Sequence, residues 1–129
     1  MLWLAARVQR PAVVSTRASQ AERALARAEE YLDRRLAQPL SVPRLAEVVG
    51  LSQSHLARCF RARHGVTIPR YLLTRRVELA QQLLITTDLS IREIGRRVGW
   101  PDPQRFNKQF RRITGRSPSA FRGFPGFGG

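Results

Sequence analysis

The chain has 129 residues, 43% of them hydrophobic, so it can bury one modest core or two very small cores packed together. Its 23 basic residues outnumber 9 acidic ones, and the net charge is uneven, +3 over residues 1–40 and +11 over residues 41–122. This charge is typical of a protein that binds a polyanion, and the lone cysteine, Cys59, excludes a disulfide framework or a cysteine metal cluster.

The first 18 residues show no sustained hydrophobic period, and we expect residues 1–18 to form a weakly ordered arm. An apolar stretch from Leu2 to Ala6 ends at Arg7 and is too short for a signal peptide or a membrane span. No membrane partner is therefore predicted, and the reducing cytoplasm is the expected compartment.

Three helices are predicted in the first half of the chain. Apolar residues recur at helical spacing from Ser19 to about Leu36, and Pro39 ends this helix. Two short helices follow over residues 42–49 and 53–63, each opened by a serine N-cap and closed by a glycine. The caps are Ser41 and Ser52, and the closing glycines are Gly50 and Gly65.

The second half begins with a longer predicted helix over residues 69–86. A short helix then starts at Ser90 with the capping-box pattern Ser-Ile-Arg-Glu and ends at Gly99. Asp102 and Pro103 open a further helix over residues 103–113.

One more turn is expected over residues 118–122. Residues 123–129 hold four glycines and a proline, and we expect a flexible tail there.

The two pairs of short helices are copies of one unit, because residues of like kind recur 49 or 50 positions apart. Leu45, Gly50, Leu56, Phe60, Gly65 and Tyr71 recur as Ile94, Gly99, Phe106, Phe110, Gly115 and Phe121. A short helix, a glycine turn and an amphipathic helix form a helix-turn-helix (HTH) pattern. The sequence therefore predicts an all-α domain over residues 19–122, with HTH subdomains at 41–64 and 90–114 joined by a central linker helix, 69–86.

The second helix of each unit has an apolar face and a polar face. The polar faces carry, at matching repeat positions, Ser54, Arg58 and Arg61 in one copy and Gln104, Lys108 and Arg111 in the other. Arginine and lysine can donate to guanine, and glutamine can pair with adenine, so both helices are predicted to read double-stranded DNA in major grooves one helical turn apart. Since the two faces differ, the expected target is asymmetric.

Residues 38–122 contain further residues whose types and spacings form one longer pattern. The first half reads Ser41-Val42, Leu45-Ala46, His55-Leu56-x-Arg58-x-Phe60-Arg61, Gly65 and Arg76-Val77-x-x-Ala80, and the second reads Ser90-Ile91-x-Glu93-Ile94, Val98-Gly99-Trp100-x-Asp102, Phe106-x-x-x-Phe110-Arg111 and Gly115-x-Ser117-Pro118-x-x-Phe121-Arg122. This pattern resembles the DNA-binding domain of AraC/XylS-type bacterial transcription regulators. The resemblance implies sequence-specific promoter binding, usually with activation through contact with RNA polymerase.

Family position and the helical wheel together give two sets of candidate site residues. The base-reading candidates are Ser54, Ala57, Arg58, Gln104, Arg105, Asn107 and Lys108. The phosphate candidates, which would position the protein without specifying sequence, are Ser41, Gln53, Arg61, Ser90, Arg111 and Arg112. We expect Glu47, Glu78 and Glu93 to form structural ion pairs, and Cys59, Trp100, Phe106, Phe110 and Phe121 to lie in the core.

The sequence departs from the family pattern in two places and at its N-terminus. Gly95 stands where the family usually has alanine, and Trp100 replaces the usual phenylalanine. Many relatives carry a sensor domain of well over a hundred residues, which about 40 residues cannot build. A free-standing domain that acts as a monomer is therefore expected, and a fragment of a longer regulator is the alternative.

Other functions fit the residues less well. The main alternative is a basic helical protein that binds DNA or RNA without sequence preference, through charge alone. No nucleophile, base and orienting partner can be assembled, so no enzyme is predicted. His55 and His64 lie nine residues apart, which fits no zinc motif, and neither a cofactor nor a small-molecule effector site is predicted.

Overall fold

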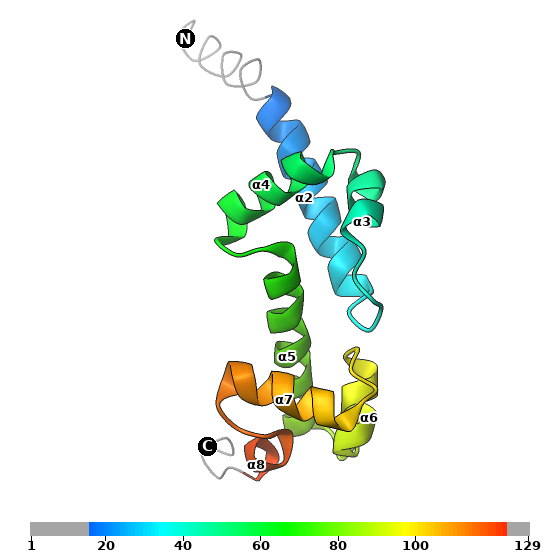
Figure 1. Cartoon of the computed structure of the whole chain (residues 1–129), viewed down its shortest axis with the longest axis vertical. Coiled ribbons are helices and arrows are strands. Elements are labelled where there is room, and N and C mark those ends of the chain that lie inside the picture. Colours follow the sequence, from blue (N-terminus) through cyan, green and yellow to red (C-terminus); the bar gives the residue numbers. More distant parts are fainter. Residues whose placement is uncertain (1–15, 124–129) are drawn as a thin grey trace, which may run out of the picture.

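The computed structural model describes residues 16–123, in which all regular structure is helical (Figure 1). The helices of this part of the chain are α2 (Thr16–Arg34), α3 (Val42–Val49), α4 (Gln53–His64), α5 (Ile68–Thr86), α6 (Ile91–Arg97), α7 (Pro103–Thr114) and α8 (Pro118–Arg122). The all-α prediction and each predicted helix are confirmed. Helix α2 begins at Thr16, so the last three residues of the predicted arm are helical, and it ends at Arg34, before the predicted end at Leu36. The rest of the predicted arm, residues 1–15, and residues 124–129 of the predicted tail lie outside the described residues.

Short polar side chains begin the helices, as the sequence indicates. Each accepts a hydrogen bond from a backbone N–H of the first turn, which would otherwise lack a partner. These N-caps are Ser41, Ser52, Thr67, Ser90, Asp102 and Ser117. The Ser90 hydroxyl accepts from the Glu93 backbone N–H at 3.0 Å, while the Glu93 carboxylate pairs with Arg97 at 3.1 Å.

The apolar side chains form two separate cores. The first is built by α2, α3 and α4 with Ile68 at the start of α5, and the second by the remainder of α5 with α6, α7 and α8. Residues at matching repeat positions are completely buried in the two cores, namely Leu45 with Ile94, Leu56 with Phe106, and Phe60 with Phe110. The predicted repeat is thus two HTH units, each with its own core, and α5 belongs to both. We call them the first unit and the second unit.

The remaining residues predicted to lie in the core do so, although Cys59 is less buried than expected. Trp100 and Phe121 are each 4% exposed and lie in the second core. Cys59 is half-buried and packs against the edge of the first core.

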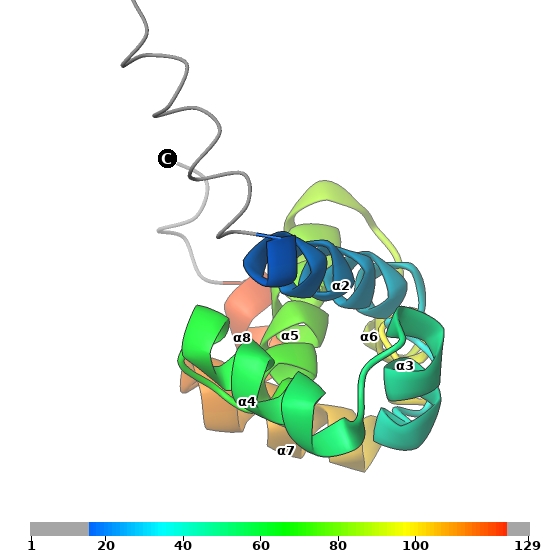
Figure 2. The same cartoon turned by 90° about the horizontal axis from the view of Figure 1, so that it is seen from above.

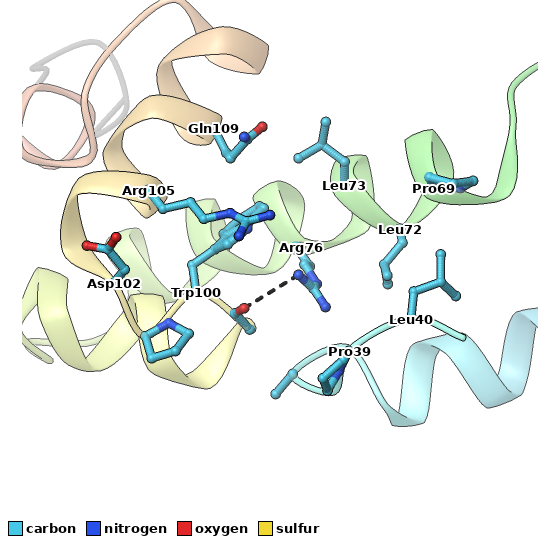
Figure 3. Close-up of a pocket in the computed structure, with 13 residues that line it drawn as sticks. Pro39, Leu40, Pro69, Leu72, Leu73, Arg76, Trp100, Asp102, Arg105 and Gln109 are labelled. Atoms are coloured by element: carbon cyan, nitrogen blue, oxygen red, sulfur yellow. Dashed lines mark hydrogen bonds between the residues drawn. The ribbon is translucent and has the colours of Figure 1, made fainter. Parts of the chain in front are cut away.

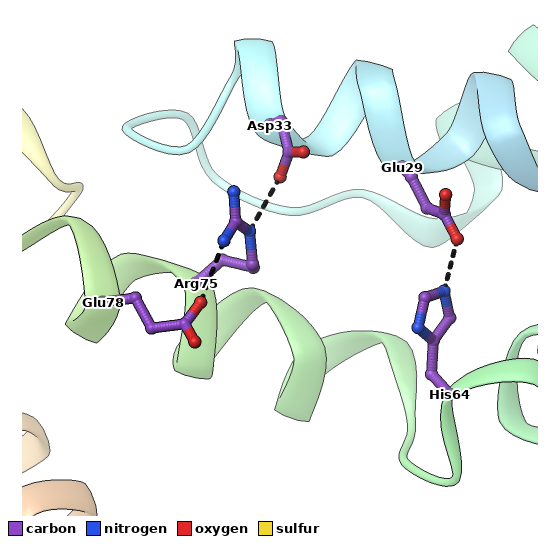
Figure 4. Close-up of polar contacts among 5 residues, drawn as sticks. All are labelled: Glu29, Asp33, His64, Arg75 and Glu78. Carbon is purple, nitrogen blue, oxygen red and sulfur yellow. Dashed lines mark hydrogen bonds and ion pairs between the residues drawn. The ribbon is translucent and has the colours of Figure 1, made fainter.

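Acidic residues of α2 join this helix to the end of α4 and to α5 (Figure 4). The Glu29 carboxylate lies 2.6 Å from His64 Nε2 and 3.2 Å from Arg63 Nε, at the end of α4. One turn further along, Asp33 accepts a hydrogen bond from Arg75 Nε of α5 at 3.1 Å, and Arg75 also pairs with Glu78 at 2.9 Å. These hydrogen bonds raise the pKa of Arg75 above its ordinary value. The predicted ion pairing of Glu78 is confirmed.

Two further arginines stabilise helix ends, where backbone carbonyls lack partners within the helix. Arg122 of α8 donates to the carbonyls of Leu84, Thr87 and Leu89 at 2.6–3.2 Å, and so closes the end of α5. Arg27 of α2 donates to the carbonyl of Val49, the last residue of α3, at 3.0 Å. Part of the basic charge therefore stabilises the fold.

Gly95 lies where α6 packs tightly against Trp100, in the turn after α6, and against Phe106 of α7. A Cβ atom there would meet the Trp100 carbonyl oxygen at 2.8 Å and the Phe106 ring at 2.9 Å. The Phe106 ring is stacked on Trp100, with centroids 5.8 Å apart. The two departures from the family pattern are thus in contact with the same phenylalanine.

Gly95→Ala should destabilise the second unit. Alanine favours a helix by about 1 kcal/mol over glycine, but overpacking costs about 1–3 kcal/mol, and the backbone oxygen cannot move away freely. Because the closest atom is a backbone oxygen, the overpacking cost should lie at about 2–3 kcal/mol, and the free energy of unfolding should fall by about 1–2 kcal/mol in urea denaturation followed by circular dichroism. Gly123→Ala is the matched control, because its Cβ would lie 3.6 Å from the nearest atom. A Gly95→Ala protein as stable as the parent would refute this packing argument.

Candidate nucleic-acid interface

The two predicted reading helices, α4 and α7, lie on the same side of the molecule. Viewed along the long axis, α7 lies behind α4, and α2 lies on the opposite side of α5 (Figure 2). Figure 1 shows the same helices crossing the molecule one above the other. A single straight duplex can therefore face both helices at once.

Burial of one face of α4 fixes which side chains it presents to solvent. Leu56 and Phe60 are fully buried, and Gly65 ends the helix in a left-handed conformation with φ of 73°. The opposite face is exposed and carries the candidates Gln53, Ser54, Ala57, Arg58 and Arg61.

Helix α7 repeats this arrangement in the second unit. Phe106 and Phe110 are fully buried, and the Asp102 carboxylate accepts from the Gln104 backbone N–H at 3.0 Å. The exposed side carries the candidates Gln104, Asn107, Lys108, Arg111 and Arg112.

The exposed faces of α4 and α7 are positively charged, and neither helix contains an acidic residue. Among the side chains that the structure describes, the ion pairs join other cations to Glu29, Glu30, Asp33, Glu47, Glu78 and Glu93. Arg58, Arg61, Lys108 and Arg111 take part in none of these pairs. Their charge is available to a polyanion.

Arg105 does not share the reading face of α7. It extends into a groove between the two units, where Gln109 of the same helix also lies (Figure 3). The groove is further lined by Leu40 of the first unit and by Leu73 and Arg76 of α5. The structure therefore brings Gln104, Asn107 and Lys108 together and places Arg105 apart from them, on the edge of α7 that faces the first unit.

A shallow apolar depression lies beside the first reading helix. It is lined by Ala57, Arg58 and Arg61 of α4, together with Val42 of α3 and Ile68 of α5. Ala57 thus offers an apolar surface between two cations.

The two serine candidates, Ser41 and Ser90, are exposed and act as N-caps. The Ser41 hydroxyl accepts from the Arg44 backbone N–H at 3.3 Å, and Ser90 occupies the matching position at α6. Both lie at the start of the first helix of an HTH.

Sequence reasoning did not find the structural arginines Arg27, Arg75, Arg76 and Arg122. From the sequence they count only as part of the positive charge that would bind a polyanion. Arg76 and Arg122 do belong to the family-like pattern, where they directly precede Val77 and follow Phe121, two core residues. That position next to a buried residue was the available signal.

Within residues 16–123, no three histidine, cysteine or acidic side chains come close enough to hold a metal ion. No helix in this part of the chain is long and apolar enough to cross a membrane.

Comparisons with known proteins agree with this geometry. The model of a family described as "Helix-turn-helix domain" matches residues 45–123. The arabinose operon regulatory protein of Escherichia coli is 35% identical over 94 residues, which cover 72% of this chain and 32% of that protein. The Msm operon regulatory protein of Streptococcus mutans is 40% identical over 83 residues, covering 64% of this chain and 30% of that protein. The chain thus spans about a third of the length of these regulators.

Two solved structures share the fold. One is the DNA-binding domain of AdpA, a global transcriptional factor, in complex with a target DNA. It matches with a TM-score of 0.71 and 35% identity, over 76% of this chain and 88% of that one. The other is a regulator with an AraC-type DNA-binding domain from Chromobacterium violaceum, with a TM-score of 0.73 and 28% identity, over 83% of this chain and 98% of that one.

The relatives from Escherichia coli and Streptococcus mutans are both operon regulatory proteins. The family model covers both HTH units except the first residues of α3. This chain therefore belongs to the family of AraC-type helix-turn-helix DNA-binding domains.

Proposed function

We propose that this protein is a sequence-specific transcription regulator that binds double-stranded DNA through α4 and α7 in neighbouring major grooves. The observation that supports this most strongly is the presence of two different, acid-free polar faces on one side of the molecule. Its target would be a promoter in the cytoplasm. As is usual in the family, the protein would activate transcription through contact with RNA polymerase. A monomer suffices, because one chain carries both reading helices.

The dimensions are compatible with this mode of binding. Major grooves on one face of B-DNA recur about every 34–36 Å. Helix α5 has 19 residues and is therefore about 28 Å long. Since α4 precedes one end of α5 and α7 packs beyond its middle, the two reading helices lie within reach of successive grooves.

We assign base reading to the exposed residues at the centre of each face. Arg58 and Lys108 would donate to guanine, Gln104 and Asn107 would pair with adenine, and Ser54 would donate or accept. The apolar depression beside Ala57 suits a thymine methyl group.

The remaining candidates would contact the DNA backbone. Arg61, Arg111, Arg112 and Gln53 flank the reading faces, and Ser41 and Ser90 begin the helices that would approach phosphates. Arg105 points into the gap between the units, where the intervening minor groove would lie, so we assign it to that stretch of backbone.

A protein that binds nucleic acid through charge alone is the alternative, supported by the net charge of +14. The two functions differ in how binding depends on sequence.

Selection from random duplexes, followed by sequencing, should return two unequal boxes whose centres lie about 10 base pairs apart. A charge-driven binder would return no common sequence. A palindrome would instead indicate a dimer that uses only one type of reading helix.

Arg58→Ala and Lys108→Ala should each relax preference at one or two base pairs, at a cost of about 1–3 kcal/mol on the selected site. Arg111→Ala is the matched comparison, because a lost phosphate contact weakens all sequences alike and lowers the salt slope by about one. Competition titrations on selected and random duplexes distinguish these effects. Uniform weakening by all three substitutions would show that base reading is assigned to the wrong residues.

A further inference from the structure

Arg76 joins the two units directly. It lies near the middle of α5, and its guanidinium donates to the Leu36 carbonyl through Nε at 2.7 Å and to the Gln38 carbonyl through Nη2 at 2.7 Å. Its third nitrogen, Nη1, faces the Gly99 carbonyl at 3.5 Å, shown by the dashed line in Figure 3. The guanidinium carbon also lies 5.5 Å from the centre of the Trp100 ring.

These acceptors come from opposite units. Leu36 and Gln38 belong to the connection between α2 and α3, whereas Gly99 is in the turn of the second HTH. The helix pairs that pack extensively either lie within one unit or include α5. Besides α5 itself, Arg76 is therefore a direct link between the first unit and the turn that precedes α7.

The backbones of the two units also approach each other closely at this point. A Cβ atom on Gly99 would lie 2.7 Å from the Arg76 guanidinium carbon and 2.9 Å from the Leu36 carbonyl oxygen. Gly99 also has a φ of +101°, which side chains rarely adopt. A glycine is required here for the turn and for the contact between units.

The link is costly to break. Burial lowers the pKa of Arg76, and the positive charge of Arg105 lowers it further, but the ordinary value is so high that the group stays protonated. A half-buried cation that loses its carbonyl partners keeps its desolvation cost, so alternative arrangements of the two units are disfavoured.

We propose that Arg76 is a positioning residue that sets the distance and angle between the two reading helices, and so sets the spacer length between the two DNA boxes. The inference rests on the proposed function. One added base pair moves the second box by about 3.4 Å and turns it by about 35° around the duplex. To follow that movement, the second unit must turn away from the first, which the Arg76 link resists.

The test uses the site selected by the parent protein, with the spacer shortened or lengthened by one base pair. For the parent we expect the Kd to rise at least about tenfold, because one reading helix loses its base contacts. We call the ratio of the Kd on an altered spacer to the Kd on the original spacer the spacer penalty. For Arg76→Ala we expect a higher Kd on the original spacer and a spacer penalty of about threefold or less. Arg76→Lys keeps the charge but cannot span both units, so its spacer penalty should also fall. This variant carries the test if Arg76→Ala is too unstable to study.

Arg75→Ala is the matched control. It removes the same charge from the same helix, but Arg75 contacts Asp33 and Glu78 and does not touch the second unit. Its spacer penalty should equal that of the parent. Urea denaturation of each variant separates loss of folding from loss of spacing control.

The possible failures are distinguishable. If the parent selects no pair of boxes, the proposed function is wrong. If the parent shows a sharp spacer preference and Arg76→Ala and Arg76→Lys keep the same penalty, the role of Arg76 is overturned while the proposed function stands.

Discussion

The structure depends on one helix that is buried in two cores at once. Ile68 at the start of α5 packs in the first core, and Val77, Ala80 and Leu84 further along it pack in the second. Each HTH unit is attached to α5, because each uses that helix to complete its own hydrophobic core. The packing of α5 places both reading helices on one helix, and the proposed Arg76 link holds the angle between the two units where they meet.

Arginine serves two purposes, and the acidic residues separate them. Four acidic residues, Glu22, Glu29, Glu30 and Asp33, are concentrated on α2, a helix that lies on the opposite side of α5 from α7 (Figure 2). Arginines that contact these acids or backbone carbonyls, such as Arg63 and Arg75, stabilise the fold, whereas Arg58, Arg61, Arg111 and Arg112 on α4 and α7 are exposed and take part in no ion pair with them. The uneven positive field that results would draw DNA to one face.

The sequence predicted the repeat, the helices and the buried residues well, because these follow from local periodicity and from caps such as Ser52 and Asp102. It did not predict the partners of Arg76 or Arg122, since those carbonyls lie 23 to 40 residues away along the chain, and only packing brings them together. Arg105 joined Gln104 among the candidates through family position, and the structure was needed to show that it lines the groove between the units, because the direction of the neighbouring unit is absent from a single-helix projection. Gly95 showed as a weak helix former, and only the structure explains it through the Trp100 carbonyl and the Phe106 ring.

Chemical protection of guanine N7 on the selected duplex tests the central claim most directly, because that atom faces the major groove. The account predicts two clusters of protected bases about one helical turn apart on one face, the first lost with Arg58→Ala and the second with Lys108→Ala. Protection confined to a single cluster, or spread evenly along the duplex, would contradict it.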